Sequence, residues 1–336
     1  MKLGISWVVN DLTSYPELVR GTEAAGFDVI GVPDTQASTY RECYVAMTTC
    51  LLSTERIRAV TLVTNPITRH PAVTASALAS LAELSGGRAM LGIGTGDTGV
   101  FNLGLTPAKV ATLREYLLAV QTLLKAQPAQ WKGRTSKLIW PKEGVPVLVA
   151  GEGERVLGLA GEVANAALAG GGVAPGSIRR AIESLKAGAE KAGRDPQTIE
   201  LWWMLRGSLA DSYEEALEWG LPGMIAGARH SFRSGVDGKD LPESLKEPMR
   251  QLQLRYDVTA HNQTGAGNPN GRLARELGLA DFLAESFGLV GTPRQIVDRL
   301  RSLKDQGVEN VIMRIGTPDR LRFLKTWREE VAPKLK

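Results

Sequence analysis

Short apolar runs rich in β-branched residues alternate along this chain with longer segments whose apolar positions recur at helical spacing. Eight of the runs have the length of a strand, and helical segments lie between them. A crossover after every strand favours parallel pairing, because strands joined in this way run in the same direction. The expected strands span residues 3–8, 29–33, 57–63, 88–94, 145–150, 164–169, 199–205 and 310–315.

Glycine and proline mark several of the expected helix ends. Gly26 and Gly307 each follow a helical segment, a position where glycine commonly ends a helix. Pro71 stands in the first turn of another segment, where a missing N–H costs nothing. A hairpin turn is expected at 132–134. The expected helices span residues 14–25, 40–52, 71–84, 107–125, 152–161, 175–192, 212–227, 293–306 and 318–331.

Eight strand–helix units in 336 residues fit a closed barrel better than an open sheet. We therefore predict an α/β protein, a single (β/α)8 TIM barrel over residues 1–336. Residues 229–287 are rich in proline and glycine, with helical pieces near 243–256 and 272–285, and are interpreted as an insertion after the seventh strand. Trp202 and Trp203 are adjacent in that strand, so one should point into the barrel and one outward.

Composition and charge narrow the class of protein. A net charge of +4 without a dense basic block argues against a nucleic-acid partner. There is no apolar stretch of membrane-spanning length and no signal-peptide layout. Cys43 and Cys50 lie seven apart in one expected helix, and the three histidines are widely scattered, so neither type suggests a metal site. We expect a cytoplasmic protein that acts on a small molecule, with no metal, nucleic acid or membrane partner.

Polar and glycine residues follow the ends of the expected strands. In a barrel of this kind the active site lies at the carboxyl ends of the strands, where these residues would gather. The candidates are Ser6, Asp34, Thr35, Thr64, Asn65, Thr95, Gly96, Asp97, Gly151, Glu152, Gly153, Gly170, Gly171, Gly172 and Arg206.

Each candidate also has a purely structural interpretation. Asp34 and Asp97 could be turn or cap residues, and Glu152 could be a first-turn helix residue. The glycine loops could be tight turns, although two loops at consecutive strand ends favour an anion site. The run at 92–97, Gly-Ile-Gly-Thr-Gly-Asp, lacks the spacing of a dinucleotide fingerprint, and its glycines favour the approach of a flat ring to the backbone. Arg69 is expected to be a solvated arginine.

Three stretches carry a resemblance to a known family. Residues 63–71 read Val-Thr-Asn-Pro-Ile-Thr-Arg-His-Pro. Residues 85–97 begin with Ser-Gly-Gly-Arg and end with the glycine run above, and residues 287–293 read Phe-Gly-Leu-Val-Gly-Thr-Pro. These stretches resemble the luciferase-like monooxygenases, in particular the branch of F420-dependent methylenetetrahydromethanopterin reductases. The resemblance extends over nearly the whole chain.

The resemblance implies a flavin-like ring at the carboxyl-terminal mouth of the barrel. It implies a bulge in the third strand with a non-proline cis peptide at Leu62-Val63, and phosphate-holding loops at Gly151–Gly153 and Gly170–Val173. It maps the acidic residue of strand two to Asp34 and that of strand four to Asp97. The expected cofactor-binding residues are Ser6, Asp34, Leu62, Val63, Thr64, Thr95, Gly96, Gly151, Glu152, Gly153, Gly170, Gly171, Gly172 and Val173.

Three positions depart from the pattern of the family. Thr35 stands where relatives often have histidine, Ser6 where the reductase branch tends to have an acid, and Thr98 where it often has lysine. These departures concern the substrate more than the class of cofactor. The pterin substrate of the reductase branch is therefore not carried over to this chain.

The resemblance leads to an oxidoreductase that transfers a hydride between coenzyme F420 and a small organic substrate. Asp34 and Asp97 are the expected catalytic residues, as hydrogen-bonding or proton-handling groups. Two alternatives stay open: an FMN-dependent monooxygenase using FMNH2 and O2, and a non-catalytic flavin- or deazaflavin-binding protein. The family also implies a homodimer packed through the second and third helices, where small residues allow close contact: Ala72, Ala75, Ala77 and Ala79.

Overall fold

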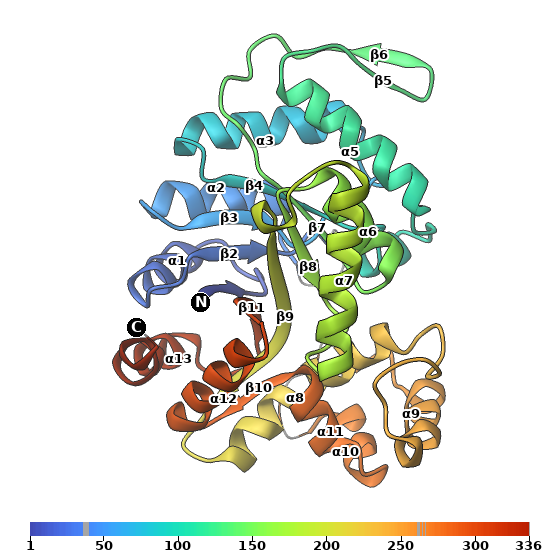
Figure 1. Ribbon diagram of the computed structural model, residues 1–336. Coiled ribbons are helices and arrows are strands. Elements are labelled where there is room, and N and C mark those ends of the chain that lie inside the picture. The colour runs from blue at the N-terminus through green and yellow to red at the C-terminus, as the bar shows by residue number, and fades with distance from the viewer. Residues whose placement is uncertain (36–39, 261–262, 264, 266, 336) are drawn as a thin grey trace.

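A computed structural model describes residues 1–35, 40–260, 263, 265 and 267–335 of the chain. In this part the apolar runs form a parallel barrel, which closes because β1 pairs with both β2 and β11, and β8 pairs with both β7 and β9 (Figure 1). The order around the barrel is β1 (Lys2–Ser6), β2 (Val29–Val32), β3 (Arg58–Thr61), β4 (Ala89–Ile93), β7 (Val147–Gly151), β8 (Ala166–Ala169), β9 (Glu200–Leu209) and β11 (Asn310–Ile315). The predicted TIM barrel is confirmed.

A further strand in the sheet was not predicted. β10 (Gly288–Gly291) pairs with the last part of β9, along the edge whose first part pairs with β8. It has four residues, two of them glycine, and it starts directly after a helix ends. Such a segment shows neither the length nor the flanking turn that marks a strand in the sequence. It covers the edge of β9 where β8 stops.

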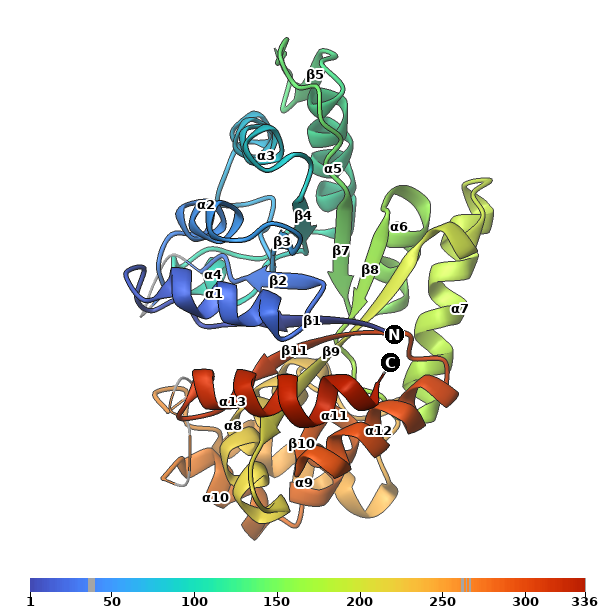
Figure 2. The ribbon, with the colours of Figure 1, turned by 90° about the vertical axis from the view of Figure 1, so that its left-hand side faces the viewer.

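The predicted helices cover the outside of the barrel (Figure 2). Gly26 and Gly307 take left-handed conformations, with φ of 87° and 91°, as their expected helix-ending role requires. The predicted hairpin at 132–134 is present as an antiparallel pair, β5 (Ala129–Trp131) and β6 (Arg134–Ser136). The helices around the barrel are α1 (Tyr15–Ala24), α2 (Cys43–Ser53), α3 (Pro71–Ser85), α4 (Thr98–Phe101), α5 (Val110–Leu124), α6 (Glu154–Val163), α7 (Pro175–Lys191), α8 (Tyr213–Ser231), α12 (Pro293–Asp305) and α13 (Arg320–Thr326).

The predicted closing helix at 318–331 is present from Arg320 onward, but it changes type along its length. α13 gives way to a π-helical turn, η2 (Trp327–Val331), and then to a 3-10 turn, η3 (Ala332–Lys334). Another 3-10 turn, η1 (Pro196–Thr198), precedes β9. Trp327 in the π-helical turn is buried and stacks on Phe27 and Phe323. The change of helix type thus occurs where this aromatic side chain packs into the core.

Two layers of apolar side chains hold the barrel together. The inner layer fills the barrel with nine buried residues: Val29, Val60, Leu62, Met90, Leu148, Ala166, Leu168, Trp202 and Ile312. The outer layer lies between strands and helices and contains Trp203. The prediction that one of the two adjacent tryptophans points inward and the other outward is therefore confirmed.

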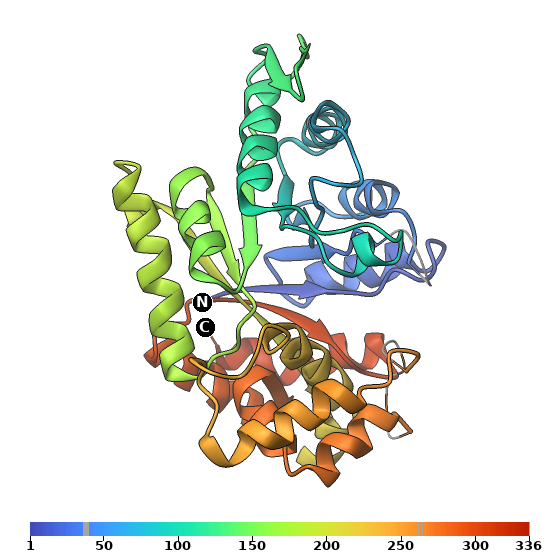
Figure 3. The same ribbon diagram turned by 90° about the vertical axis from the view of Figure 1, so that its right-hand side faces the viewer.

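The segment after β9 forms three helices beside α8: α9 (Glu243–Arg255), α10 (Pro269–Glu276) and α11 (Ala280–Phe287). They share a separate apolar cluster with α8, and Figure 3 shows this part, in orange, at the end of the molecule away from α5 (green). The single helical piece expected at 272–285 is wrong, because Gly278, with a φ of 67°, separates α10 from α11. That residues 229–287 are an insertion within one domain stays a prediction.

Candidate active site

The carboxyl ends of the strands surround a cavity of about 860 Å³. This is the end of the barrel where the polar candidates were expected to gather. Of the predicted site residues, those that line the cavity are Ser6, Asp34, Leu62, Val63, Thr95, Gly96, Asp97, Gly151, Glu152, Gly153, Gly170, Gly171 and Gly172. Three candidates without an assigned role line it as well: Thr35, Asn65 and Arg206.

Thr64 and Val173 were predicted to bind the cofactor, but neither lines the cavity. Both are buried, and the Val173 N–H donates a hydrogen bond to the carbonyl oxygen of Ser286 over 2.8 Å. The Thr64 N–H donates to Gly92 over 2.9 Å, so it continues the sheet from β3 to β4. Their backbone amides are thus used within the protein, and they support the cavity wall from behind.

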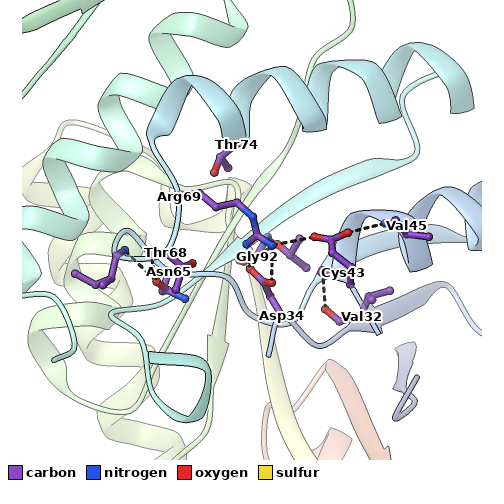
Figure 4. Close-up of polar contacts among 12 residues, drawn as sticks. Val32, Asp34, Cys43, Val45, Asn65, Thr68, Arg69, Thr74 and Gly92 are labelled. Carbon is purple, nitrogen blue, oxygen red and sulfur yellow. Dashed lines mark hydrogen bonds and ion pairs between the residues drawn. The ribbon is translucent and has the colours of Figure 1, made fainter. Parts of the chain in front are cut away.

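Asp34 follows β2 and is ion-paired with Arg69, which lies just before α3 (Figure 4). Two parallel hydrogen bonds of 2.5 and 3.1 Å join the guanidinium to the carboxylate, whose side chain is 1% exposed. Arg69 also pairs with Glu42 at 2.9 Å and lies over the ring of Tyr44, 4.9 Å from its centre. The expectation of a solvated Arg69 is therefore wrong, because the guanidinium neutralises a buried carboxylate.

The segment after β3 carries the predicted backbone feature. The peptide bond between Leu62 and Val63 is cis, as the resemblance implied. Beyond it, the Asn65 side chain accepts hydrogen bonds from the N–H groups of Ile67 and Thr68 over 2.9 and 3.0 Å. These bonds hold the loop that leads to Arg69 and α3.

Asp97, at the end of β4, contacts two basic residues that follow one another closely at the end of α8. His230 Nδ1 lies 2.8 Å from one carboxylate oxygen, and Arg233 donates to the other over 3.1 Å. The other imidazole nitrogen, Nε2, lies 3.6 Å from a carboxylate oxygen of Glu152, which follows β7. The cluster therefore places an imidazole between two carboxylates on the cavity wall.

This arrangement shifts the pKa values of its members. The hydrogen bond to Asp97 raises the pKa of His230 above its usual value. Burial acts in the opposite direction, and the charge of Glu152 raises the pKa further. Burial alone would raise the pKa of Asp97, but the hydrogen bond from His230 and the charges of His230 and Arg233 lower it. Burial raises the pKa of Glu152. The imidazole thus holds its proton more firmly than a free histidine.

The glycines of the two predicted loops leave little room for side chains. A Cβ at Gly151 would lie 2.5 Å from Val156, and one at Gly170 would lie 3.1 Å from the carboxylate of Glu152. Gly172 has a φ of 84°, and a Cβ there would lie 2.7 Å from a backbone oxygen. Gly153 is the N-cap residue of α6 and lines the cavity, so the start of this helix lies beside the cavity. The glycines of the two loops thus present backbone without side chains, while the side chain of Glu152 lies against Gly170; that the loops hold a phosphate stays a prediction.

Comparison with known proteins decides the family. Residues 5–310 match the model of the family described as luciferase-like monooxygenase. The chain belongs to this family. The 5,10-methylenetetrahydromethanopterin reductase of Methanolobus tindarius is 28% identical over 333 residues, which cover 95% of this chain and 94% of that protein.

Two solved structures show the fold of this luciferase-like protein. The coenzyme F420-dependent tetrahydromethanopterin reductase from Methanopyrus kandleri has a TM-score of 0.78 at 23% identity, covering 100% of this chain and 99% of that one. An F420-dependent secondary alcohol dehydrogenase in complex with an F420–acetone adduct has a TM-score of 0.72 at 19% identity, covering 100% and 99%. The family resemblance predicted from the sequence is confirmed. The predicted class of enzyme, a luciferase-like oxidoreductase, is confirmed as well.

Several residues of this luciferase-like site escaped the sequence analysis. His230 and Arg233 lie in and after α8, far along the chain from Asp97, and no spacing connects them. Arg314 lies in β11 and also lines the cavity. A charged residue near the end of an otherwise apolar strand is a signal that could have identified it. Nothing comparable marks His230, which only the packing of α8 brings to the site.

Proposed function

We propose that this protein binds coenzyme F420 at the barrel mouth and catalyses hydride transfer between F420 and a small organic substrate. The observation that carries the proposal is the cavity of about 860 Å³, large enough for a tricyclic ring and a second molecule. The match to the reductase from Methanolobus tindarius over nearly the full length of both chains supports the same class of reaction. Once bound, F420 would supply the ring carbon that gives or takes the hydride.

The residues present fit a flat, anionic cofactor. The end of β4 is bare backbone: a Cβ at Gly94 would lie 3.2 Å from the carbonyl oxygen of Ala150, and Gly96 has a φ of 107°. Leu62 and Val63 give the ring an apolar wall, and the glycine loops give its phosphate backbone amides.

We assign proton handling to Asp97 together with His230. The imidazole nitrogen Nδ1 is held by Asp97, while Nε2 is 3.6 Å from Glu152, beyond hydrogen-bonding distance. Nε2 is therefore placed to donate a proton to a substrate atom or to take one from it. Asp34 contributes differently, because its ion pair with Arg69 holds the loops after β2 and β3 together beside the cavity. We propose a positioning role for Asp34 in place of a proton-handling one.

A binding titration tests the cofactor. We expect F420 to bind at micromolar concentration or tighter, measured by the change in its own absorbance and fluorescence. FMN titrated in the same way is the comparison. If neither cofactor binds at micromolar level, the assignment is wrong.

The reaction separates the remaining alternatives. Anaerobic turnover of F420 with substrate supports the proposal, whereas O2 consumption with FMNH2 indicates a monooxygenase. Normal F420 affinity in Asp97→Asn, with no change in any rate, would indicate a binding protein. The family includes monooxygenases by name, so this comparison is made on the same preparation.

We also propose a cytoplasmic homodimer. Apolar side chains are exposed on the two neighbouring helices where contact was expected: Val45 and Leu52 on α2, and Val73 and Leu84 on α3. Ala75 and Ala79 pack inward instead, so the contact would be made by these larger residues. Two free, buried cysteines, Cys43 and Cys50, agree with a reducing compartment. In the described part, no helix is both long and apolar enough to span a membrane.

A further inference from the structure

Three polar residues form a row across neighbouring strands on one wall of the cavity. Ser6 of β1 is in register with Arg314 of β11, which in turn is in register with Arg206 of β9. Residues in register on parallel strands project from the same face of the sheet, and all three line the cavity. The row therefore presents two guanidinium groups and a hydroxyl side by side.

Among the residues that the structure describes, no carboxylate neutralises either arginine in the row. Arg206 Nε donates to the carbonyl oxygen of Gly223 over 3.1 Å, and Arg314 donates to the hydroxyl of Tyr40 over 2.5 Å. Within the described part, no Asp or Glu lies within ion-pair distance of either one: the carboxylate of Glu152 influences Arg206 only from further away. The nine residues outside that part include no Asp or Glu.

The surroundings of Arg206 are shaped to hold an arginine. Two glycines of α8 lie against its side chain: a Cβ at Gly223 would be 3.5 Å from its Cδ, and one at Gly227 would be 3.5 Å from its Nε. Burial and the nearby charge of Arg314 lower the pKa of Arg206 to about 10. Both side chains are half-buried, and two like charges held in register on such a wall repel each other unless an anion lies between them. The hydroxyl of Ser6, buried without a partner, is a third donor for such an anion.

We propose that Ser6, Arg206 and Arg314 form an oxyanion site that binds a carboxylate or phosphate group of the substrate. β9 lies four strands from β3 in either direction around the barrel, so Arg206 and Leu62-Val63 are on opposite walls. A substrate held by its anionic group on the β9 wall would extend toward a ring placed on the β3 wall. The substrate class is thus a small organic anion. That the bound anion belongs to the substrate rests on the proposed function. That the site binds an anion does not depend on it.

Anion binding is tested on the full chain without substrate. Sodium phosphate and sodium acetate are titrated at constant ionic strength, with sodium chloride as reference, and the shift of the thermal midpoint gives Kd. We expect Arg206→Gln and Arg314→Gln each to weaken binding of these probes roughly 10- to 100-fold, as loss of a charged hydrogen-bond donor does. Arg180→Gln is the matched control, because Arg180 lines the same cavity but is paired with Asp240. Its affinity should equal that of the wild type.

The same titration is repeated with F420 bound, after its binding has been measured by fluorescence. Anion binding that persists and still depends on both arginines supports a substrate site. Unchanged affinity in both variants, or anion binding abolished by F420, overturns the proposal. If Arg206→Gln does not fold, Arg314→Gln decides alone. Failure of F420 to bind would count against the proposed function, while arginine-dependent anion binding in the apoprotein would leave the oxyanion site standing.

Discussion

At the scale of single residues, the pKa of His230 gives the most direct test of the contacts in the site. Asp97→Asn removes the carboxylate whose hydrogen bond raises the pKa of His230, so we expect that pKa to fall. An NMR titration of the imidazole signals measures it. Arg233→Gln is the control with the opposite sign, because the charge of Arg233 lowers the pKa of His230. A His230 pKa that ignores both substitutions would contradict the contacts described.

The same histidine should make stability depend on pH. Its pKa is raised in the folded protein, so its stabilising effect is complete below the ordinary histidine value of about 6.5. The effect is lost as the pH rises through the raised pKa. We therefore expect His230→Gln to lower the free energy of unfolding more at pH 6 than at pH 9, as measured by urea denaturation. An equal or larger loss at pH 9 would refute this sign.

Arg69 gives a prediction about stability rather than chemistry. Arg69→Met removes the ion pair of a carboxylate whose side chain is 1% exposed, which should lower the free energy of unfolding by about 3 kcal/mol. Asp34→Asn in the same background should recover part of that loss, because the buried charge is then gone. A double-mutant cycle in urea measures the coupling. Strictly additive effects would mean that the pair does not act as a unit.

At the scale of elements, the sequence predicts those strands and helices that have a clear apolar periodicity and a recognisable end residue. The barrel strands and most helices follow from alternating apolar runs and from residues such as Gly26 and Pro71. β10 could not be foreseen, since four residues with two glycines gain strand geometry only by pairing with β9. His230 could not be assigned to the site either, because its contact with Asp97 depends on how α8 packs.

The contact between α6 and α7 depends on glycine. A Cβ at Gly188 would lie 1.9 Å from the carbonyl oxygen of Gly158, a backbone atom that cannot move alone. Gly188→Ala should therefore push the helices apart and cost roughly 1–3 kcal/mol or more of unfolding free energy. Gly158→Ala is the matched control, because its Cβ would lie 3.7 Å from the nearest backbone oxygen. Similar stabilities for the two variants would show that this interface tolerates side chains.

At the scale of the whole molecule, the cavity brings together residues that are distant in sequence. One wall comes from the early strands, with Leu62 and Asp97, and the opposite wall from late ones, with Arg206 and Arg314. Local patterns identify the strand ends but not which ends face each other, since that follows from closing the barrel. The charge balance of the cavity also follows from the closed structure. Asp97 is paired with His230 and Arg233, whereas Arg206 and Arg314 have no carboxylate partner among the described residues.

The exposed apolar residues on α2 and α3 allow the proposed dimer to be tested on the intact molecule. Leu52 is 64% exposed and Val73 56%, on neighbouring helices, and covering such residues is a common driving force for association. We expect the wild type to sediment at twice the 36.1 kDa mass of the chain. Leu52→Lys combined with Val73→Lys should sediment as a monomer, because two buried charges per subunit would face their symmetry mates. Leu254→Lys, at a 79% exposed position on α9, is the control and should stay dimeric. A wild-type monomer, or a double variant that still forms dimers, would mean that the subunits do not meet through these helices.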